Sequence, residues 1–322
     1  TANGFQALSN NTGSGNTAIG NNALRLNTTG SSLVALGDSS LFSNTLGYRN
    51  TAAGGQAMRS NTTGNNNVAN GTGAMYANTT GYHNVANGSS AMYANTTGFN
   101  NVANGSGAMY ANTAGANNVA NGFNAMYANT TGYENVANGS NAMRTNTTGG
   151  YNVANGSYAM YYNTSGANNV AIGHRAMYAN TIGDKNVAIG QWALYWNSSG
   201  SYNVANGQSA LIGNSSGVYN SALGYEANVD FGDLVNATAI GARAMVGDSN
   251  CLVLGSISGV NSATESVNVG IGTTTPKTRL HIVGGVDASY TATSGYLVTG
   301  DVATSNIVMD DNEIMARNNG AA

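Results

Sequence analysis

The sequence of 322 residues contains one cysteine, one proline and few charged residues. The single Cys251 excludes a framework of disulfide bonds within one chain. Charged residues make up 7% of the sequence, compared with about a quarter in an ordinary soluble domain. The hydrophobic content of 41% is nevertheless too high for a disordered chain. A single proline among 45 glycines indicates a chain that turns often without interrupting strand pairing.

The charge distribution argues against a nucleic-acid-binding protein, and the short apolar runs argue against a membrane-spanning protein. Residues 1–224 hold six basic and three acidic side chains, and residues 225–322 hold four basic and ten acidic ones. Neither part has the dense basic patch that nucleic-acid binding requires. No apolar run approaches the roughly 20 residues of a membrane span, and no signal peptide is visible.

Because the chain starts at Thr1 in mid-pattern, we expect a preceding segment.

The dominant feature is a motif Asn-Thr-x-Gly that returns every 17 residues. Ser replaces Thr in the last two copies. Its asparagines are Asn27, Asn44, Asn61, Asn78, Asn95, Asn112, Asn129, Asn146, Asn163, Asn180, Asn197 and Asn214. The consensus is N-T-T-G-x-x-N-V-A-(I/N)-G-x-x-A-M-Y-A. A fixed period of this length is typical of a solenoid, in which each repeat is one coil packed on its neighbours.

The Asn-Val-Ala-(Ile/Asn)-Gly segment predicts a strand, so the fold class is all-β: a parallel β-solenoid or β-roll of 17-residue coils. Strand alternation places Val68 and Asn70 on one face, and we expect this face to point inward because Ile occupies the Asn70 position in other coils. Stacked amides on that face would form a structural ladder. The ladder asparagines are Asn70, Asn87, Asn104, Asn121, Asn138 and Asn155. The Ala-Met-Tyr segment fits either a second strand or a single helical turn.

We expect a homotrimeric fibre. One coil offers few core side chains, and three chains lying side by side would share a core and cover their exposed edges. About sixteen coils at about 4.8 Å each would give a shaft on the order of 75 Å.

The pattern divides the chain into three parts. Residues 1–272 are the repeat shaft, residues 273–285 a junction containing Pro276, and residues 286–322 a non-repeating, acidic, β-rich module that is truncated.

These residues resemble bacteriophage tail-fibre proteins. The repeats that carry the resemblance include Asn186–Gly190, Ala193–Tyr195 and Asn197–Gly200, and the later elements are Val269–Pro276, Arg279–Ile282 and Asp310–Ala321. The resemblance implies a virion tail or extracellular location, with other tail proteins and a bacterial surface glycan or protein receptor as partners. It also implies a self-cleaving chaperone domain after the last element. The heads of trimeric autotransporter adhesins are more loosely similar, through coils of 14 residues.

An aromatic column is the best candidate for a binding surface in the shaft. It would either bind carbohydrate or pack in an interface. Its members are Tyr76, Tyr93, Tyr110, Tyr127, Tyr161, Tyr178 and Tyr195. Tyr82, Phe99, Phe123, Tyr133, Tyr158 and Trp192 lie in the variable turns.

The Asn-Thr-Thr triplets match the acceptor pattern for N-glycosylation. The matching asparagines are Asn27, Asn61, Asn78, Asn95, Asn129 and Asn146. We favour a structural role, because Asn and Thr side chains bind the local backbone in turns.

No constellation of residues predicts catalysis, a metal site or a cofactor. His83, His174 and His281 belong to different repeats, and Cys251 has no histidine near it in the pattern. The local acidic groups are Asp230 with Asp233, and Asp310, Asp311 and Glu313. We therefore expect a non-enzymatic structural fibre for host attachment. The alternatives are a bacterial cell-surface or extracellular trimeric adhesin or filament and, less favoured, a tailspike-like glycan depolymerase.

Overall fold

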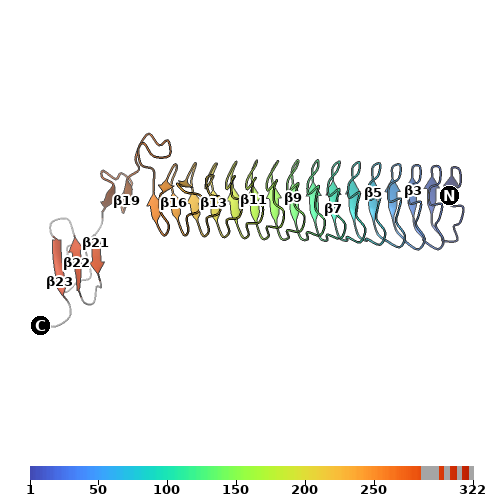
Figure 1. The fold of residues 1–322 in the computed structure, drawn as a ribbon, viewed down its shortest axis with the longest axis horizontal. Helices are drawn as coiled ribbons and strands as arrows, with labels where there is room; N and C mark the ends of the chain where they lie inside the picture. The colour runs from blue at the N-terminus through green and yellow to red at the C-terminus, as the bar shows by residue number, and fades with distance from the viewer. Residues whose placement is uncertain (284–296, 301–304, 310–313, 319–322) are drawn as a thin grey trace. The chain divides into compact units, whose positions relative to one another are not determined.

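The computed structural model describes residues 1–283, 297–300, 305–309 and 314–318, which form strands and turns but no helix. The chain divides into two compact units, Thr1–Val253 and Leu254–Ala322. The first unit is a straight stack of similar coils that runs from the N-terminus to strand β16 (Figure 1).

Sixteen short strands, one per coil, form a single sheet in the order β1 to β14, then β16 and β18. They are β1 (Ala2–Asn3), β2 (Thr17–Ile19), β3 (Val34–Leu36), β4 (Thr51–Ala53), β5 (Val68–Asn70), β6 (Val85–Asn87), β7 (Val102–Asn104), β8 (Val119–Asn121), β9 (Val136–Asn138), β10 (Val153–Asn155), β11 (Val170–Ile172), β12 (Val187–Ile189), β13 (Val204–Asn206), β14 (Ser221–Leu223), β16 (Thr238–Ile240) and β18 (Leu252–Leu254). Strands β15 (Asn228–Val229) and β17 (Met245–Val246) form a separate parallel pair.

The strands are parallel and in register. Val68 lies opposite Val85 and Asn70 opposite Asn87, so in these strands each residue faces the residue 17 positions further along the chain. The backbone closes the ladder, because the amide of Val68 donates to the carbonyl of Asn84 at 2.8 Å. The predicted parallel β-solenoid with a period of 17 residues is confirmed.

The predicted facing of the strands is wrong. Ala69 is fully buried, whereas Val68 is partly exposed and Asn70 is exposed. In the three-residue strands from β2 to β14 and in β16, the middle residue points inward and its two flanking residues point outward. Alanine occupies the inner position of all these strands, since a small side chain suits a closely packed interior, while the larger side chains face outward.

Each coil encloses a core of its own. Ala69, Ala74 and Met75 are fully buried, and so are the side chains of Asn61 and Asn67. The reason given for a trimer, a core shared between chains, therefore does not hold. A partner chain would instead have to cover the outward residues of the sheet.

The Asn-Thr-Thr-Gly segment forms the tightest turn of the coil. The carbonyl oxygen of Thr79 accepts hydrogen bonds from the backbone amides of Thr62, Thr63 and Gly64, at 3.0, 3.2 and 3.2 Å. The Thr62 hydroxyl donates to the same oxygen at 3.0 Å. A Cβ on Gly64 would lie 2.4 Å from Asn61 Oδ1. Glycine is required here because the buried asparagine fills the space that a side chain would need.

The Ala-Met-Tyr segment is neither a strand nor a helical turn. It forms an irregular turn in which Met75 has a φ of 51°, and the same left-handed backbone recurs at the equivalent methionine or leucine of other coils. The Met75 amide donates to Ala91 of the next coil at 2.9 Å. Stacking between coils thus holds a backbone conformation that non-glycine residues disfavour.

The second unit contains two further small sheets. Strand β19 (Val269–Ile271) pairs in parallel with β20 (Leu280–Ile282), with Pro276 in the segment between them. Strands β21 (Leu297–Gly300), β22 (Ser305–Met309) and β23 (Ile314–Asn318) form an antiparallel sheet. The predicted shaft boundary at residue 272 thus lies beyond the last strand of the main sheet, β18.

Candidate functional site

Two ladders of asparagine side chains run through the interior. In the first, the Asn95 side-chain amide donates to Asn78 Oδ1 at 2.7 Å and to the Gly98 carbonyl at 3.2 Å. In the second, Asn84 donates to Gly98 at 2.8 Å and to Asn67 Oδ1 at 3.2 Å. Both hydrogens of the Asn84 and Asn95 amides are used, so these buried polar groups are satisfied.

The first ladder contains every predicted glycosylation residue. The side chains concerned are fully buried: Asn27, Asn61, Asn78, Asn95, Asn129 and Asn146. Their Nδ2 atoms, which would carry the sugar, already donate two hydrogen bonds inside the coil. In the folded shaft, these nitrogens are therefore inaccessible to a glycosyltransferase.

The predicted asparagine ladder exists, but it lies on the outer face of the sheet. Side-chain hydrogen bonds of 2.8 to 2.9 Å join its members. They connect Asn70, Asn87, Asn104, Asn121 and Asn138. Asn155 pairs with Asn138 through the backbone only, as far as the described residues show. The prediction that these amides are buried is thus wrong. The buried amides belong instead to the two ladders inside the coil.

The tyrosine column consists of two stacks of rings along the shaft. Tyr76, Tyr93, Tyr110 and Tyr127 stack with ring centroids 4.9 to 5.1 Å apart. Tyr161, Tyr178 and Tyr195 form a second stack at 5.0 to 5.4 Å. These rings pack on one another and are half-buried, which leaves edges and hydroxyl groups at the surface.

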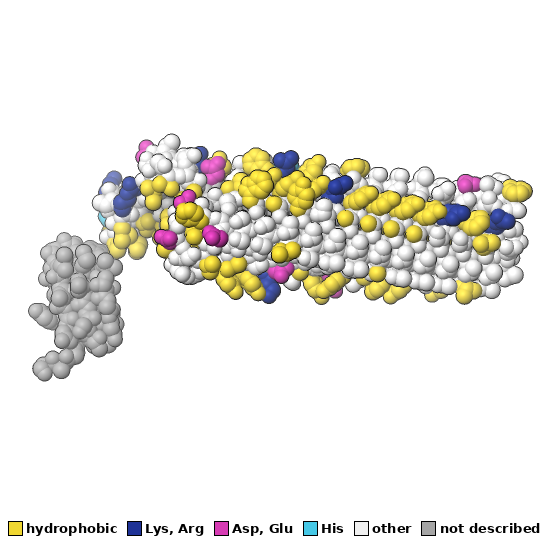
Figure 2. All heavy atoms as spheres, in the orientation of Figure 1, with side chains coloured by type: hydrophobic (Ala, Val, Ile, Leu, Met, Phe, Trp, Pro, Cys, Tyr) yellow, Lys and Arg dark blue, Asp and Glu magenta, His cyan; other side chains and the backbone are white. Residues whose placement is uncertain are grey.

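Arginine side chains extend the column and bridge its gap. The Arg144 guanidinium lies 5.4 Å from the centre of the Tyr127 ring and 5.7 Å from that of Tyr161. Arg59 lies 5.1 Å from Phe42 and 5.9 Å from Tyr76 in the same way. Figure 2 shows the resulting row of hydrophobic side chains with basic side chains at intervals. Sequence reasoning missed these arginines, although the 17-residue register places them in the tyrosine position.

The densest aromatic cluster lies toward the C-terminal end of the stack. Its side chains are Tyr158, Tyr161, Tyr162, Tyr178, Trp192, Tyr195 and Trp196. Tyr162 contacts Tyr178 edge to face at 5.1 Å. Partial burial, together with a hydrogen bond from the Tyr178 hydroxyl to Tyr162, raises the pKa of Tyr178 to about 12. The cluster holds tyrosine in its neutral form, in which it can donate hydrogen bonds.

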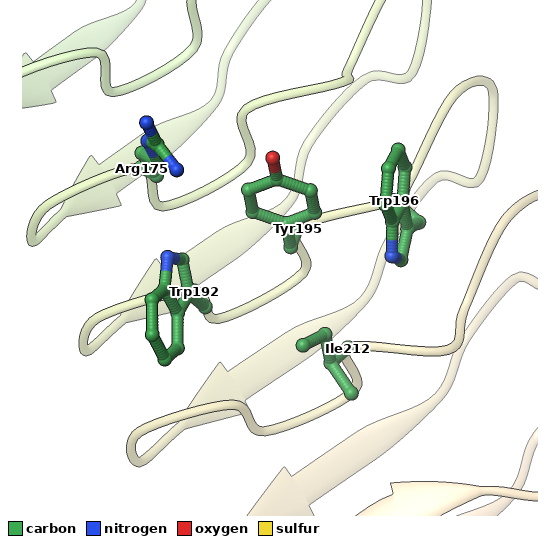
Figure 3. A pocket seen from close by; sticks show the side chains of 5 residues that line it. All are labelled: Arg175, Trp192, Tyr195, Trp196 and Ile212. Carbon is green, nitrogen blue, oxygen red and sulfur yellow. The ribbon is translucent and has the colours of Figure 1, made fainter.

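This cluster contains a shallow pocket of about 280 Å³. It is lined by Arg175, Trp192, Tyr195, Trp196 and Ile212. In Figure 3 the two indole rings flank Tyr195, and Ile212 lies beside them on the next coil. The Tyr195 and Trp196 rings meet edge to face, with centroids 4.6 Å apart. Of these five residues, the sequence analysis singled out Tyr195 in the tyrosine column and Trp192 among the turn aromatics, and only the coil geometry joins them to Arg175, Trp196 and Ile212.

The other aromatic turn residues form smaller contacts. Tyr82 stacks on Phe99 at 5.1 Å, and Tyr133 meets Tyr151 edge to face. Phe123 is exposed. None of these residues lines the pocket.

The outer face of the sheet carries apolar side chains near both ends of the stack. Exposed residues on it include Ile19, Leu36, Ile172, Ile189, Leu223 and Ile240. A second pocket of about 290 Å³ lies on this face, between β13, β14 and β16.

The residues considered for catalysis do not assemble into a site. Asp230 and Asp233 are exposed, as are His83, His174 and Cys251. His83 packs against the edge of Tyr82. Across the described residues no three His, Cys, Asp or Glu side chains are grouped as metal ligands would be. Asp310, Asp311 and Glu313 lie outside the described residues.

Comparison with known proteins identifies no family for this chain. No protein-family model and no curated protein matches the chain. In the described part of the chain, no helix has the length and apolar character needed to cross a membrane.

Proposed function

We propose that this chain is a structural fibre, the shaft of a bacteriophage tail fibre that attaches the particle to a bacterial surface. The observation that carries the proposal is the pair of internal asparagine ladders, which run through most of the stack as far as Asn214 and Asn220. Along these ladders each coil is bonded to the next by side chains as well as by backbone, so the stack resists bending and local opening. Such a rod is suited to mechanical reach.

The proposal includes self-association into three parallel chains. The apolar columns on the sheet face support it, because exposed apolar rows of this extent mark interaction surfaces. Three copies would also multiply weak receptor contacts along the shaft. The proposed partners are other copies of the chain, other tail proteins and a bacterial surface glycan or protein.

Light scattering and negative-stain electron microscopy of the purified chain test the rod and its stoichiometry. We expect a thin rod with the mass of three chains. A rod with the mass of one chain would reject the trimer and keep the shaft, whereas a compact particle would reject both.

Antibodies raised against the rod test its location. Labelling of phage tails in the source culture is the expected result, and labelling of bacterial cell surfaces alone would assign the chain to an adhesin. Release of reducing sugar ends from surface polysaccharide, abolished by Asp230→Asn or Asp233→Asn, would overturn the non-enzymatic assignment.

A further inference from the structure

The pocket beside Tyr195 contains both tryptophans of the chain. Trp192 and Trp196 lie four residues apart in one coil and flank Tyr195 (Figure 3). Trp196 is 57% exposed. The volume of the pocket, about 280 Å³, is near the lower end of the range for ligand pockets, about 300–1,000 Å³.

The fold does not require large rings at these two positions. Other coils have Gly73, Ser90 or Asn124 where this coil has Trp192, and Ala77 or Ala94 where it has Trp196. Trp192 has a φ of 59°, a backbone conformation that is costly for a bulky residue and cheap for glycine or asparagine. The coil thus holds two indole rings at the surface without any gain in core packing.

The pocket is positively charged. The Arg175 guanidinium is held between aromatic rings, 5.7 Å from the centre of Tyr158 and 5.8 Å from that of Tyr178. In the part of the chain that the structure describes, its Nε is buried without a hydrogen-bond partner, and no carboxylate forms an ion pair with the guanidinium. In residues 157–213 the only acidic side chain is Asp184, and its carboxylate accepts a hydrogen bond from the Ala167 amide at 2.7 Å.

We propose that this pocket binds an acidic saccharide, a pyranose ring that carries a carboxylate, within a bacterial surface polysaccharide. Indole and phenol rings offer flat apolar faces to the C–H groups of a sugar ring, and a guanidinium binds a carboxylate through paired hydrogen bonds. The proposal rests on the proposed attachment function and gives it a location on the shaft.

Tryptophan fluorescence reports on the pocket directly, because both indoles of the protein line it. We would titrate the full chain with oligosaccharides of hexuronic acid and, in parallel, with the same oligosaccharides after reduction of the carboxyl groups. The expected result is a saturable fluorescence change with the acidic series and at least about tenfold weaker binding of the reduced series, equivalent to about 1.4 kcal/mol.

The repeats supply variants that keep the fold. Trp192→Asn, Trp196→Ala and Arg175→Gln each introduce a residue that another coil carries at the equivalent position, as in Asn124, Ala77 and Gln56. We expect each to weaken binding of the acidic series at least about tenfold, measured by calorimetry. The matched control, Tyr93→Phe, lies in the same column outside the pocket and should leave binding unchanged.

Equal binding of the acidic and reduced series would overturn the role of Arg175. Absence of binding by a chain that is still a rod would overturn the saccharide site and leave the shaft function standing. A chain that is no longer a rod would instead count against the proposed function itself. Unchanged affinity in both tryptophan variants would place the sugar elsewhere and also overturn the proposal.

Discussion

The side-chain amide of Asn95 donates a hydrogen bond of 2.7 Å to the side-chain oxygen of Asn78, and both side chains are fully buried. The same bond links the equivalent residues of successive coils. A buried amide is stabilising only while its partners are present, because an unpaired buried polar group costs about 1–3 kcal/mol. The ladder therefore makes each coil depend on both of its neighbours.

Replacement of a ladder asparagine should be costly. Asn95→Ala removes the donor to Asn78 and Gly98 and the acceptor of Asn112. We expect a loss of about 3–5 kcal/mol in the free energy of unfolding, measured by denaturant titration with circular dichroism. Asn70→Ala on the outer ladder is the control, and it should cost less than about 1 kcal/mol because water can replace its bond. Equal losses of unfolding free energy in the two variants would show that burial does not determine how much a ladder asparagine stabilises the fold.

The left-handed turn at Met75 gives a second prediction. Met75 is fully buried with a φ of 51°, and Leu24, Leu41 and Leu194 occupy the same position with φ near 50°. Met75→Leu should be nearly neutral. Met75→Ile should lower the free energy of unfolding by about 1–3 kcal/mol relative to Met75→Leu, since a β-branched side chain is strained at positive φ.

Thermal unfolding of the two variants measures this difference. Leucine and isoleucine have the same atoms, so the comparison isolates branching from volume. Equal melting temperatures would mean that the turn relaxes to negative φ, which the hydrogen bond from Met75 to Ala91 argues against.

The sequence predicts the period, the strand and the solenoid because these follow from spacing alone. It does not predict that Ala69 rather than Asn70 points inward, because alternation fixes which residues share a face but not which face is the core. Apolar Ile172 and Ile189 suggested the core, yet they lie on the exposed face. The tyrosine column was visible from register, while the pocket combines residues of three coils that only the coil shape brings together.

Tyr178 predicts how stability depends on alkaline pH. Its pKa is about 12 in the folded chain, raised by burial and by Tyr162, and about 10 in an unfolded chain. Below pH 10 the side chain is protonated in both states, and this stabilisation is fully present. Between pH 10 and 12 the unfolded chain loses the proton first, so the free energy of unfolding falls as the pH rises.

Ultraviolet absorbance of tyrosinate tests this assignment. The difference between titrations of the native chain and of Tyr178→Phe should show one ionisation near pH 12, which moves to about pH 10 in denaturant. Tyr162→Phe should shift the ionisation of Tyr178 downward, because one cause of the raised pKa is removed. An ionisation near pH 10 in the native chain would contradict the prediction.

The outer sheet face provides the sharpest test of association. Ile189 is 38% exposed, and six successive coils carry asparagine at its position without loss of the fold. Ile172→Asn with Ile189→Asn should therefore leave the monomer folded and remove apolar area from the interface. If this face joins the chains, light scattering should show trimers dissociating at higher protein concentration than for the native chain, while circular dichroism stays the same. Thr63→Asn, on the exposed turn, is the control and should not change the dissociation. If the sheet-face variants leave the trimers unchanged, the chains would have to associate through another surface. The tyrosine column would then be the next face to substitute, because it is a second long row of aromatic side chains along the shaft.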